Sequence, residues 1–292
     1  MTTQIELLKK YGLSVRGHLG QHLLIDPNMQ RKIVDLLEIS SKDFIFEIGP
    51  GLGAITQEIL RRGARVLAVE KDKNFISILK EELSPFKGKF KIAHEDILQF
   101  DLNKIASKTV RPPFKVISNL PYYITAPILF KLIESRKLFS KAVFTMQKEV
   151  AQRLFASPGS KDYGRFTLGI QYAASAKHAF DIPPSCFTPQ PEVDSSVVEL
   201  VFYPEARRLK KNDEIFLFEL IQTAFSQRRK TFLNLLVHDS KIKLDREKIL
   251  SIFESLGISA TTRGEELLLK DYMNLAEKFK TLQSKKLLKK EV

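Results

Sequence analysis

Short apolar runs alternate with amphipathic helical patterns from about residue 27 to residue 155. Strands that are separated by helices pair in parallel, because the chain must cross back over the sheet before the next strand begins. The alternation therefore predicts an α/β fold with a doubly wound sheet, in which ligands bind beyond the carboxyl ends of the strands. The runs that we interpret as strands are FIFEI (44–48), RVLAVE (65–70), KFKIAHED (89–96), FKVISN (114–119) and AVFTMQ (142–147).

The pattern becomes helical from about residue 205. Three amphipathic segments with few strand signals follow: 213–238, 245–257 and 266–282. A chain of 292 residues is long enough for about two domains. We therefore predict an α/β domain over residues 1–204 and a small helical domain over residues 205–292.

The charge balance points to a polyanionic partner. Lys and Arg number 47 against 34 Asp and Glu, a formal net charge of +13, which attracts nucleic acid or an anionic membrane surface. Apolar runs are too short for a membrane span, and the first residues lack a signal-peptide pattern. The single Cys186 fits a reducing compartment, and the five histidines show no zinc spacing. We expect a cytoplasmic protein without a metal.

The first chemical motif is EIGPGLGA (47–54), at the turn from the first strand into a helix. Glycines there let the backbone approach a ligand closely. Gly49, Gly51 and Ala54 satisfy the dinucleotide pattern, and Gly49, Gly51 and Gly53 equally satisfy the glycine loop of an S-adenosylmethionine site. Taken alone, the motif also has another explanation, a tight strand-to-helix turn that binds no ligand.

Two carboxylates follow at the ends of the next strands. Glu70 ends the second strand, 21 residues after Gly49, where a carboxylate can accept hydrogen bonds from ribose hydroxyls. Asp96 follows the third strand and can accept from the amino group of an adenine. A nicotinamide cofactor and S-adenosylmethionine both carry an adenosine ribose, so these carboxylates are consistent with either cofactor.

The fourth strand ends in SNLPYYIT (118–125). An exocyclic amine of a nucleobase is a poor nucleophile, because its lone pair is delocalised into the ring. Two acceptors on its N–H bonds would localise and aim that lone pair, and the Asn119 side-chain oxygen and the Leu120 carbonyl can be those acceptors. Pro121 rigidifies the turn, and Tyr122 offers a flat face for the base.

The chain also resembles a known family in a series of ordered blocks. They are GQHLLID, FEIGPGLGAIT, VEKD, HEDIL, SNLPYYIT, QKEVAQRL, DYGRFT, FTPQPEVDSSV and FSQRRKT. They resemble, in this order, the blocks of the KsgA-type ribosomal RNA adenine N6,N6-dimethyltransferases, from about residue 20 to residue 267. The resemblance implies a class I S-adenosylmethionine-dependent methyltransferase with a Rossmann-like, seven-stranded, mostly parallel sheet, an antiparallel seventh strand and a C-terminal helical domain that helps to grip RNA.

The resemblance also implies an activity and site residues. Two methyl groups would pass from S-adenosylmethionine, which leaves as S-adenosylhomocysteine, to each of two adjacent adenosines in the 3′-terminal hairpin loop of 16S rRNA. Phe187 would close the base pocket opposite Tyr122. His22 stands where asparagine is more familiar, and both side chains can donate to a cofactor carboxylate. The implied cofactor contacts are His22, Leu24, Gly49, Gly51, Glu70, Asp96 and Asn119.

RNA phosphates would contact basic side chains outside this pocket. We interpret the three consecutive cations of SQRRK as part of an amphipathic helix. We expect the enzyme to act as a monomer on the small ribosomal subunit or its assembly intermediate. The candidate RNA-binding residues are Arg16, His18, Lys161, Arg165, Arg228, Arg229 and Lys230.

Three other functions share some of these features. A macrolide-resistance type enzyme would methylate one adenosine of 23S rRNA with a similar pocket. A ribosome-assembly or transcription factor would use the fold and the basic surface without turnover, although intact motifs argue for catalysis. A nicotinamide dehydrogenase would leave SNLPYYIT unexplained.

Overall fold

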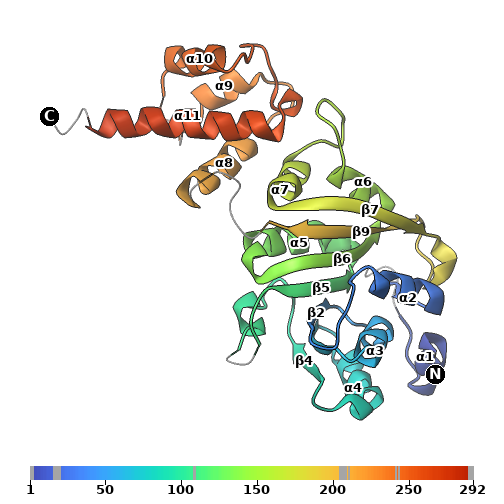
Figure 1. The fold of residues 1–292 in the computed structure, drawn as a ribbon. Helices are drawn as coiled ribbons and strands as arrows, with labels where there is room; N and C mark the ends of the chain where they lie inside the picture. Colours follow the sequence, from blue (N-terminus) through green and yellow to red (C-terminus); the bar gives the residue numbers. More distant parts are fainter. Residues whose placement is uncertain are drawn as a thin grey trace. The chain divides into compact units, whose positions relative to one another are not determined.

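The computed structural model describes residues 3–15, 21–107, 110–203, 209, 211–240, 242 and 244–288. The chain divides into two compact units (Figure 1). We call them the N-terminal unit, Met1–Gln152 with Ala174–Pro204, and the helical unit, Arg153–Ala173 with Glu205–Val292.

The N-terminal unit is built around a seven-stranded sheet with the strand order β4-β3-β2-β5-β6-β9-β7. The first five strands of this order are parallel, and β9 is antiparallel to both of its neighbours. The predicted α/β class with a mostly parallel sheet and one antiparallel strand is therefore confirmed. The strands are β2 (Phe44–Ile48), β3 (Arg65–Glu70), β4 (Phe90–His94), β5 (Phe114–Asn119), β6 (Phe139–Gln147), β7 (Ala174–Ile182) and β9 (Ser195–Phe202).

The strand order reverses between β2 and β5. From β2 the chain runs outward through β3 to β4, whereas β5 pairs on the other side of β2. Both central strands are apolar, and Ile45, Phe46 and Val116 are fully buried. A reversal of this kind leaves a crevice beyond the carboxyl ends of the two strands, and this crevice is the usual ligand site of the fold.

Helices connect the strands of this unit and cover the sheet (Figure 1). Asp26 caps α2 by accepting hydrogen bonds from the Asn28 and Met29 amides at 2.8 and 2.9 Å. Ile33 of α2 and Ile59 of α3 are fully buried in one apolar cluster with residues of β2 and β3, which anchors both helices on the sheet. The helices are α1 (Gln4–Lys10), α2 (Pro27–Asp35), α3 (Ala54–Arg61), α4 (Lys73–Glu82), α5 (Thr125–Glu134) and α6 (Lys148–Leu154).

The helical unit has its own core. Leu217, Phe232, Phe253 and Phe279 are buried in it, one from each of its helices after α7. Tyr172 of α7 is buried in the same cluster. Residues 153–173, which we expected within a domain over 1–204, therefore group with this unit, because packing over long sequence separations decides membership. The helices are α7 (Arg165–Ala173), α8 (Lys211–Ala224), α9 (Phe232–Val237), α10 (Arg246–Ser255) and α11 (Leu269–Leu288).

Two features of the described chain differ from the expectation. The cations of SQRRK lie in a turn between α8 and α9, so placing them within a helix was wrong. Thr231 ends that turn, because its side chain accepts a hydrogen bond from the Asn234 amide and caps α9. The structure also contains three strands that the sequence pattern did not predict. They are β7 and the short strands β1 (Leu23–Leu24) and β8 (Phe187–Thr188), which pair with each other.

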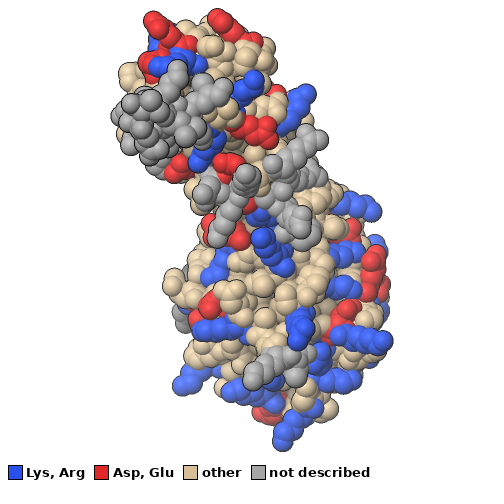
Figure 2. Space-filling model, turned by 60° about the vertical axis from the view of Figure 1, so that its left-hand side comes forward, with Lys and Arg blue, Asp and Glu red and all other residues tan. Residues whose placement is uncertain are grey.

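None of the helices in the described ranges is long and apolar enough to cross a membrane. Within the same ranges, no cluster of His, Cys, Asp and Glu side chains could hold a metal ion. Figure 2 shows Lys and Arg side chains spread over both units on the visible face, with Asp and Glu side chains between them.

Candidate functional site

A cavity of about 480 Å³ lies in the N-terminal unit beyond the carboxyl ends of β2, β3 and β5. Most of the predicted catalytic and cofactor residues line it together, although they come from five segments of the chain. Those residues are His22, Gly49, Gly51, Glu70, Asp96, Asn119, Leu120, Pro121 and Tyr122.

The glycine loop brings the backbone to the cavity wall. Gly49 and Gly51 have φ values of +63° and +57°, a region that side chains other than glycine rarely adopt. A Cβ atom on Gly51 would lie 2.9 Å from Cδ2 of Leu23, whereas one on Gly49 would meet nothing within 4 Å. Space beside Gly49 is therefore open to a ligand.

Glu70 is held by backbone donors at the end of β3. Its carboxylate accepts hydrogen bonds from the Lys71 and Asp72 amides, both at 2.8 Å, and from the Gly51 amide at 3.3 Å. Burial nevertheless raises the pKa of the Glu70 carboxyl. The three donors fix the carboxylate in one orientation, with acceptor capacity left for ligand hydroxyls.

Asp96 contributes an ionised carboxylate to the same cavity. One oxygen accepts from the Leu98 amide at 2.9 Å, and the other accepts from Nζ of Lys71 at 2.8 Å. The bond from Lys71 is the main cause that lowers the pKa of the Asp96 carboxyl. This carboxylate remains an acceptor at neutral pH, as recognition of an adenine amino group requires.

Asn119 presents an acceptor without a partner. Its Nδ2 donates to the carbonyl of His22 at 2.7 Å, which fixes the orientation of the amide. Its Oδ1 is buried and has no hydrogen-bond partner. A buried carbonyl oxygen without a donor costs free energy, so this atom is an acceptor ready for a ligand N–H. The adjoining turn is held in place because the Leu120 amide donates to the Thr145 carbonyl at 2.9 Å.

Tyr122 is fixed by two contacts that the sequence did not suggest. Its hydroxyl forms a 2.7 Å hydrogen bond with Oγ of Ser195, which is fully buried. Its ring stacks on the ring of His22, with centroids 5.1 Å apart and 26° between the planes. Nδ1 of His22 donates to the Pro189 carbonyl at 2.7 Å, so Nε2 is an acceptor in the neutral ring and donates to a cofactor carboxylate only when the ring is protonated. Ser195 lies in the quoted block FTPQPEVDSSV, which is the one signal that could have identified it.

Leu24 and Phe187 are placed differently from the other predicted residues. They face each other in the β1–β8 pair, and they are 4% and 1% exposed. Both belong to the apolar cluster beneath the sheet face, and neither is among the residues that line the cavity. Leu23, the neighbour of Leu24, lines it instead.

The predicted RNA-binding residues are only partly described. Arg16 and His18 lie outside the described residues. In the helical unit, Nη2 of Arg228 donates to the Lys161 carbonyl at 2.7 Å, which joins two of the predicted segments. Arg165 is exposed at the first position of α7.

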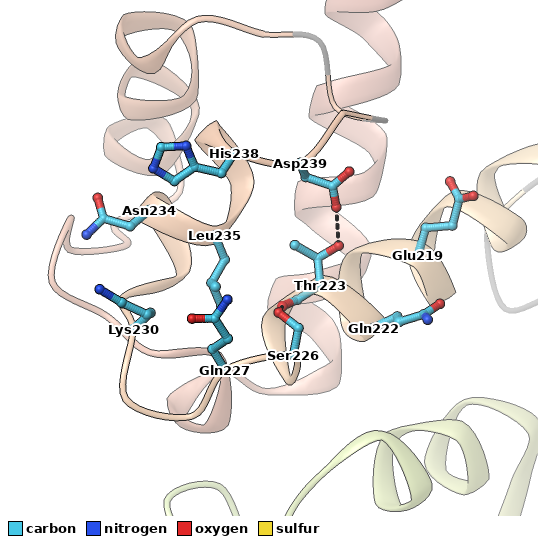
Figure 3. A pocket seen from close by; sticks show the side chains of 10 residues that line it. All are labelled: Glu219, Gln222, Thr223, Ser226, Gln227, Lys230, Asn234, Leu235, His238 and Asp239. Carbon is cyan, nitrogen blue, oxygen red and sulfur yellow. Dashed lines mark hydrogen bonds between the residues drawn. The ribbon is translucent and has the colours of Figure 1, made fainter.

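A second cavity, of about 570 Å³, lies within the helical unit (Figure 3). Its lining side chains come from α8, from the turn between α8 and α9, from α9 and from the two residues that follow α9. Of the predicted residues it contains Lys230 alone. The lining residues are Glu219, Gln222, Thr223, Ser226, Gln227, Lys230, Asn234, Leu235, His238 and Asp239.

The first cavity fits S-adenosylmethionine by its own chemistry. The glycine loop leaves room for a ligand beside Gly49, Glu70 is a fixed acceptor, and Asp96 is an ionised one. A dinucleotide would use these acceptors too. The unpartnered Oδ1 of Asn119 is an acceptor for a donor group, such as an N–H, that enters the cavity.

Comparisons with known proteins decide between these cofactors. A family model described as "Ribosomal RNA adenine dimethylase" matches residues 12–280. A "Ribosomal RNA small subunit methyltransferase A" from Geobacillus sp. (strain WCH70) is 41% identical over 274 residues, which is 93% of this chain and 94% of that protein.

Two solved structures share the fold. A dimethyladenosine transferase from Plasmodium falciparum has a TM-score of 0.75 and 27% identity, covering 89% of this chain and 98% of that one. The 23S rRNA methyltransferase ErmE has a TM-score of 0.65 and 21% identity, covering 88% of this chain and 99% of that one; at that identity the likeness concerns the fold alone.

Proposed function

This chain belongs to the ribosomal RNA adenine dimethylase family, and from that premise we propose that it dimethylates N6 of two adjacent adenosines in the 3′-terminal hairpin loop of 16S rRNA. It is a methyltransferase of class I fold that uses S-adenosylmethionine. The observation that carries the proposed mechanism is the buried, unpartnered Oδ1 of Asn119 at the cavity wall.

We propose that the residues at the ends of β2, β3 and β4 hold the cofactor. Glu70 would accept from its ribose hydroxyls and Asp96 from its adenine amino group, while Gly49 gives the backbone room to approach. Leu24, though buried, remains a proposed cofactor contact. When bound, S-adenosylmethionine supplies the methyl group and is converted to S-adenosylhomocysteine.

Asn119 and Leu120 would aim the amino group of the substrate. The Asn119 amide cannot rotate freely, because its Nδ2 is bonded to the His22 carbonyl. Its Oδ1 and the Leu120 carbonyl would therefore accept the two N–H bonds of an adenine N6 and direct the lone pair of that nitrogen. Such positioning can lower a barrier by roughly 7–11 kcal/mol in well-oriented systems, so a strong general base is unnecessary.

Tyr122 would stack on the extruded base. One face of its ring is covered by His22, which leaves the opposite face for the adenine. The Ser195 bond holds the hydroxyl, so the ring is oriented before the base arrives. Phe187 remains the residue proposed to close the base pocket opposite Tyr122, although it is buried in the apolar cluster that includes β8. Base–aromatic stacking contributes about 1–3 kcal/mol.

The identity of the rRNA rests on the relatives. The protein from Geobacillus is named for the small subunit and is 41% identical, whereas ErmE shares the fold at 21% identity. This difference favours 16S over 23S rRNA. The net charge of +13 and the basic residues Lys161, Arg165 and Arg228–Lys230 suit an RNA substrate. We propose that the enzyme acts as a monomer in the cytoplasm, where ribosomes are assembled.

Labelled S-adenosylmethionine and undermethylated small ribosomal subunits test this function. We expect label in N6,N6-dimethyladenosine of 16S rRNA, and a much slower incorporation of label when Asn119 is replaced by alanine at matched enzyme concentration. Label in 23S rRNA would identify the macrolide-resistance activity instead. Binding of small subunits without any transfer of label would indicate an assembly factor.

A further inference from the structure

The second cavity, in the helical unit, has the chemistry of a site for a polar ligand. Apart from Leu235, its lining residues carry hydrogen-bonding or charged side chains. An apolar ligand would remove water from these groups without replacing their hydrogen bonds, and this desolvation costs free energy. Three carboxamides line it, Gln222, Gln227 and Asn234, and carboxamides offer donors and acceptors side by side. This combination matches the edge of a nucleobase.

Contacts within the unit decide which of these groups are available. Oδ1 of Asn234 accepts from Nη1 of Arg246 at 3.1 Å, which leaves the two N–H donors of that amide. The Thr223 hydroxyl donates to Asp239 (Figure 3). Gln227 and Lys230 are exposed at the cavity rim. The available groups are thus mainly amide donors and acceptors and one ammonium.

The cavity opens beside the basic turn between α8 and α9. Lys230 belongs to both the turn and the lining, and Arg228 is anchored to the Lys161 carbonyl at 2.7 Å. Cations of this kind bind phosphates and carry no sequence information, whereas amides read base edges. The volume of about 570 Å³ accommodates a mononucleotide. The carboxylates of Glu219 and Asp239 in the lining disfavour a free phosphate ion.

We propose that this cavity binds an unpaired nucleotide of the rRNA substrate, distinct from the adenosines that are methylated. The base lies among the carboxamides of Gln227 and Asn234, and its phosphate contacts Lys230. The inference rests on the proposed function, because it takes rRNA as the ligand. Sequence-specific recognition of RNA is directed mainly at such unpaired nucleotides. The cavity thereby adds selectivity to a domain whose basic turn alone would bind any RNA.

The first test compares the affinity for undermethylated small subunits, with saturating S-adenosylhomocysteine. Gln227→Ala removes a base contact, and Asn234→Asp keeps an acceptor for Arg246 but removes the donors. We expect Gln227→Ala to weaken binding about 2- to 12-fold, the range for one net hydrogen bond, without changing the dependence on salt. Asn234→Asp should weaken binding at least as much, because its added carboxylate also repels the RNA phosphates. Lys230→Ala should weaken binding and lower the slope of log K against log salt by about 1.

Matched controls lie on α11, away from the cavity. Asn274→Ala and Lys278→Ala remove an exposed amide and an exposed cation, and both should bind subunits like the parent. If Gln227→Ala and Asn234→Asp also bind like the parent, the proposal is wrong. If Lys230→Ala alone weakens binding, the turn contacts the RNA backbone and the cavity holds no base, which also overturns it.

A second measurement does not depend on the ribosome. The full chain, labelled with ¹⁵N and saturated with S-adenosylhomocysteine, is titrated with the four nucleoside 5′-monophosphates. We expect at least one to shift the side-chain amide signals of Gln227 and Asn234 while the Asn274 signal stays. Unmoved signals with all four nucleotides would refute the proposal even if methylation of 16S rRNA succeeds. Failure of methylation with shifted signals would instead count against the proposed function alone.

Discussion

Replacing Asn119 with alanine should separate activity from stability. The substitution removes Oδ1, the proposed acceptor for one N–H of the substrate amino group. An N–H left without its partner in a buried site costs about 1–3 kcal/mol, which corresponds to a loss of about 5- to 150-fold in kcat/KM. Because the misdirected lone pair affects the transition state, most of the loss should appear in kcat.

The same substitution should cost little stability. It breaks the 2.7 Å bond from Nδ2 to the His22 carbonyl, worth about 0.5–1.5 kcal/mol, but it also removes the unpartnered Oδ1, whose burial costs about 1–3 kcal/mol. We therefore expect an unchanged or slightly raised Tm.

The assay is single-turnover methylation of undermethylated small subunits, alongside thermal unfolding and S-adenosylhomocysteine affinity. Asn274→Ala, on the surface of α11, serves as the control and should leave all three unchanged. A variant that retains full kcat would refute the role of Oδ1. A large fall in Tm with a proportional loss of active protein would show that Asn119 is mainly structural.

Three further predictions follow from single contacts. Burial, with a smaller contribution from the Glu70 charge, raises the pKa of the Glu47 carboxyl to about 8. The contribution of Glu47 to the free energy of unfolding is therefore fully present below pH 4.5, and up to roughly 5 kcal/mol of it is lost as the pH rises to 8. Glu47→Gln should flatten this part of the pH dependence of the unfolding free energy, measured by denaturant titration. An unchanged slope in the variant would contradict this prediction. Gly51→Ala should destabilise the folded protein by about 1–2 kcal/mol, because residue 51 has a positive φ, and it should weaken S-adenosylhomocysteine binding measured by calorimetry. Unaltered binding would contradict the proposal that the glycine loop contacts the cofactor. Tyr122→Phe and Ser195→Ala should each lower the unfolding free energy by about 1–3 kcal/mol, and the double variant should cost less than their sum; strict additivity would argue against the hydroxyl bond.

The apolar strands could be predicted from the sequence because burial on both faces leaves continuous apolar runs. The predicted bounds 44–48, 65–70 and 114–119 coincide with those of β2, β3 and β5. The strand β7 could not be predicted in this way. It is an edge strand with Ser175, Lys177 and His178 along it, and its place depends on pairing with β9. Hydrogen bonds to a partner strand leave no trace in a local pattern.

Cavity residues that belong to a local sequence motif could be predicted. Cavity residues that are placed by contacts with distant parts of the chain could not. Asn119 and Glu70 lie at strand ends, and the fold brings such positions together. The ring stack of His22 on Tyr122 joins residues 100 positions apart, and the Ser195 bond spans 73 positions. The turn between α8 and α9 contains neither Gly nor Pro, so the second cavity could not be anticipated.

The most direct measurement is a crystal structure of the protein with S-adenosylhomocysteine and a hairpin-loop RNA that ends in unmethylated adjacent adenosines. We predict an extruded adenine whose N6 lies within hydrogen-bond distance of Asn119 Oδ1 and the Leu120 carbonyl, stacked on the face of Tyr122 that His22 leaves free. An adenine bound elsewhere, or an Asn119 Oδ1 that accepts from the protein while the base is bound, would contradict it.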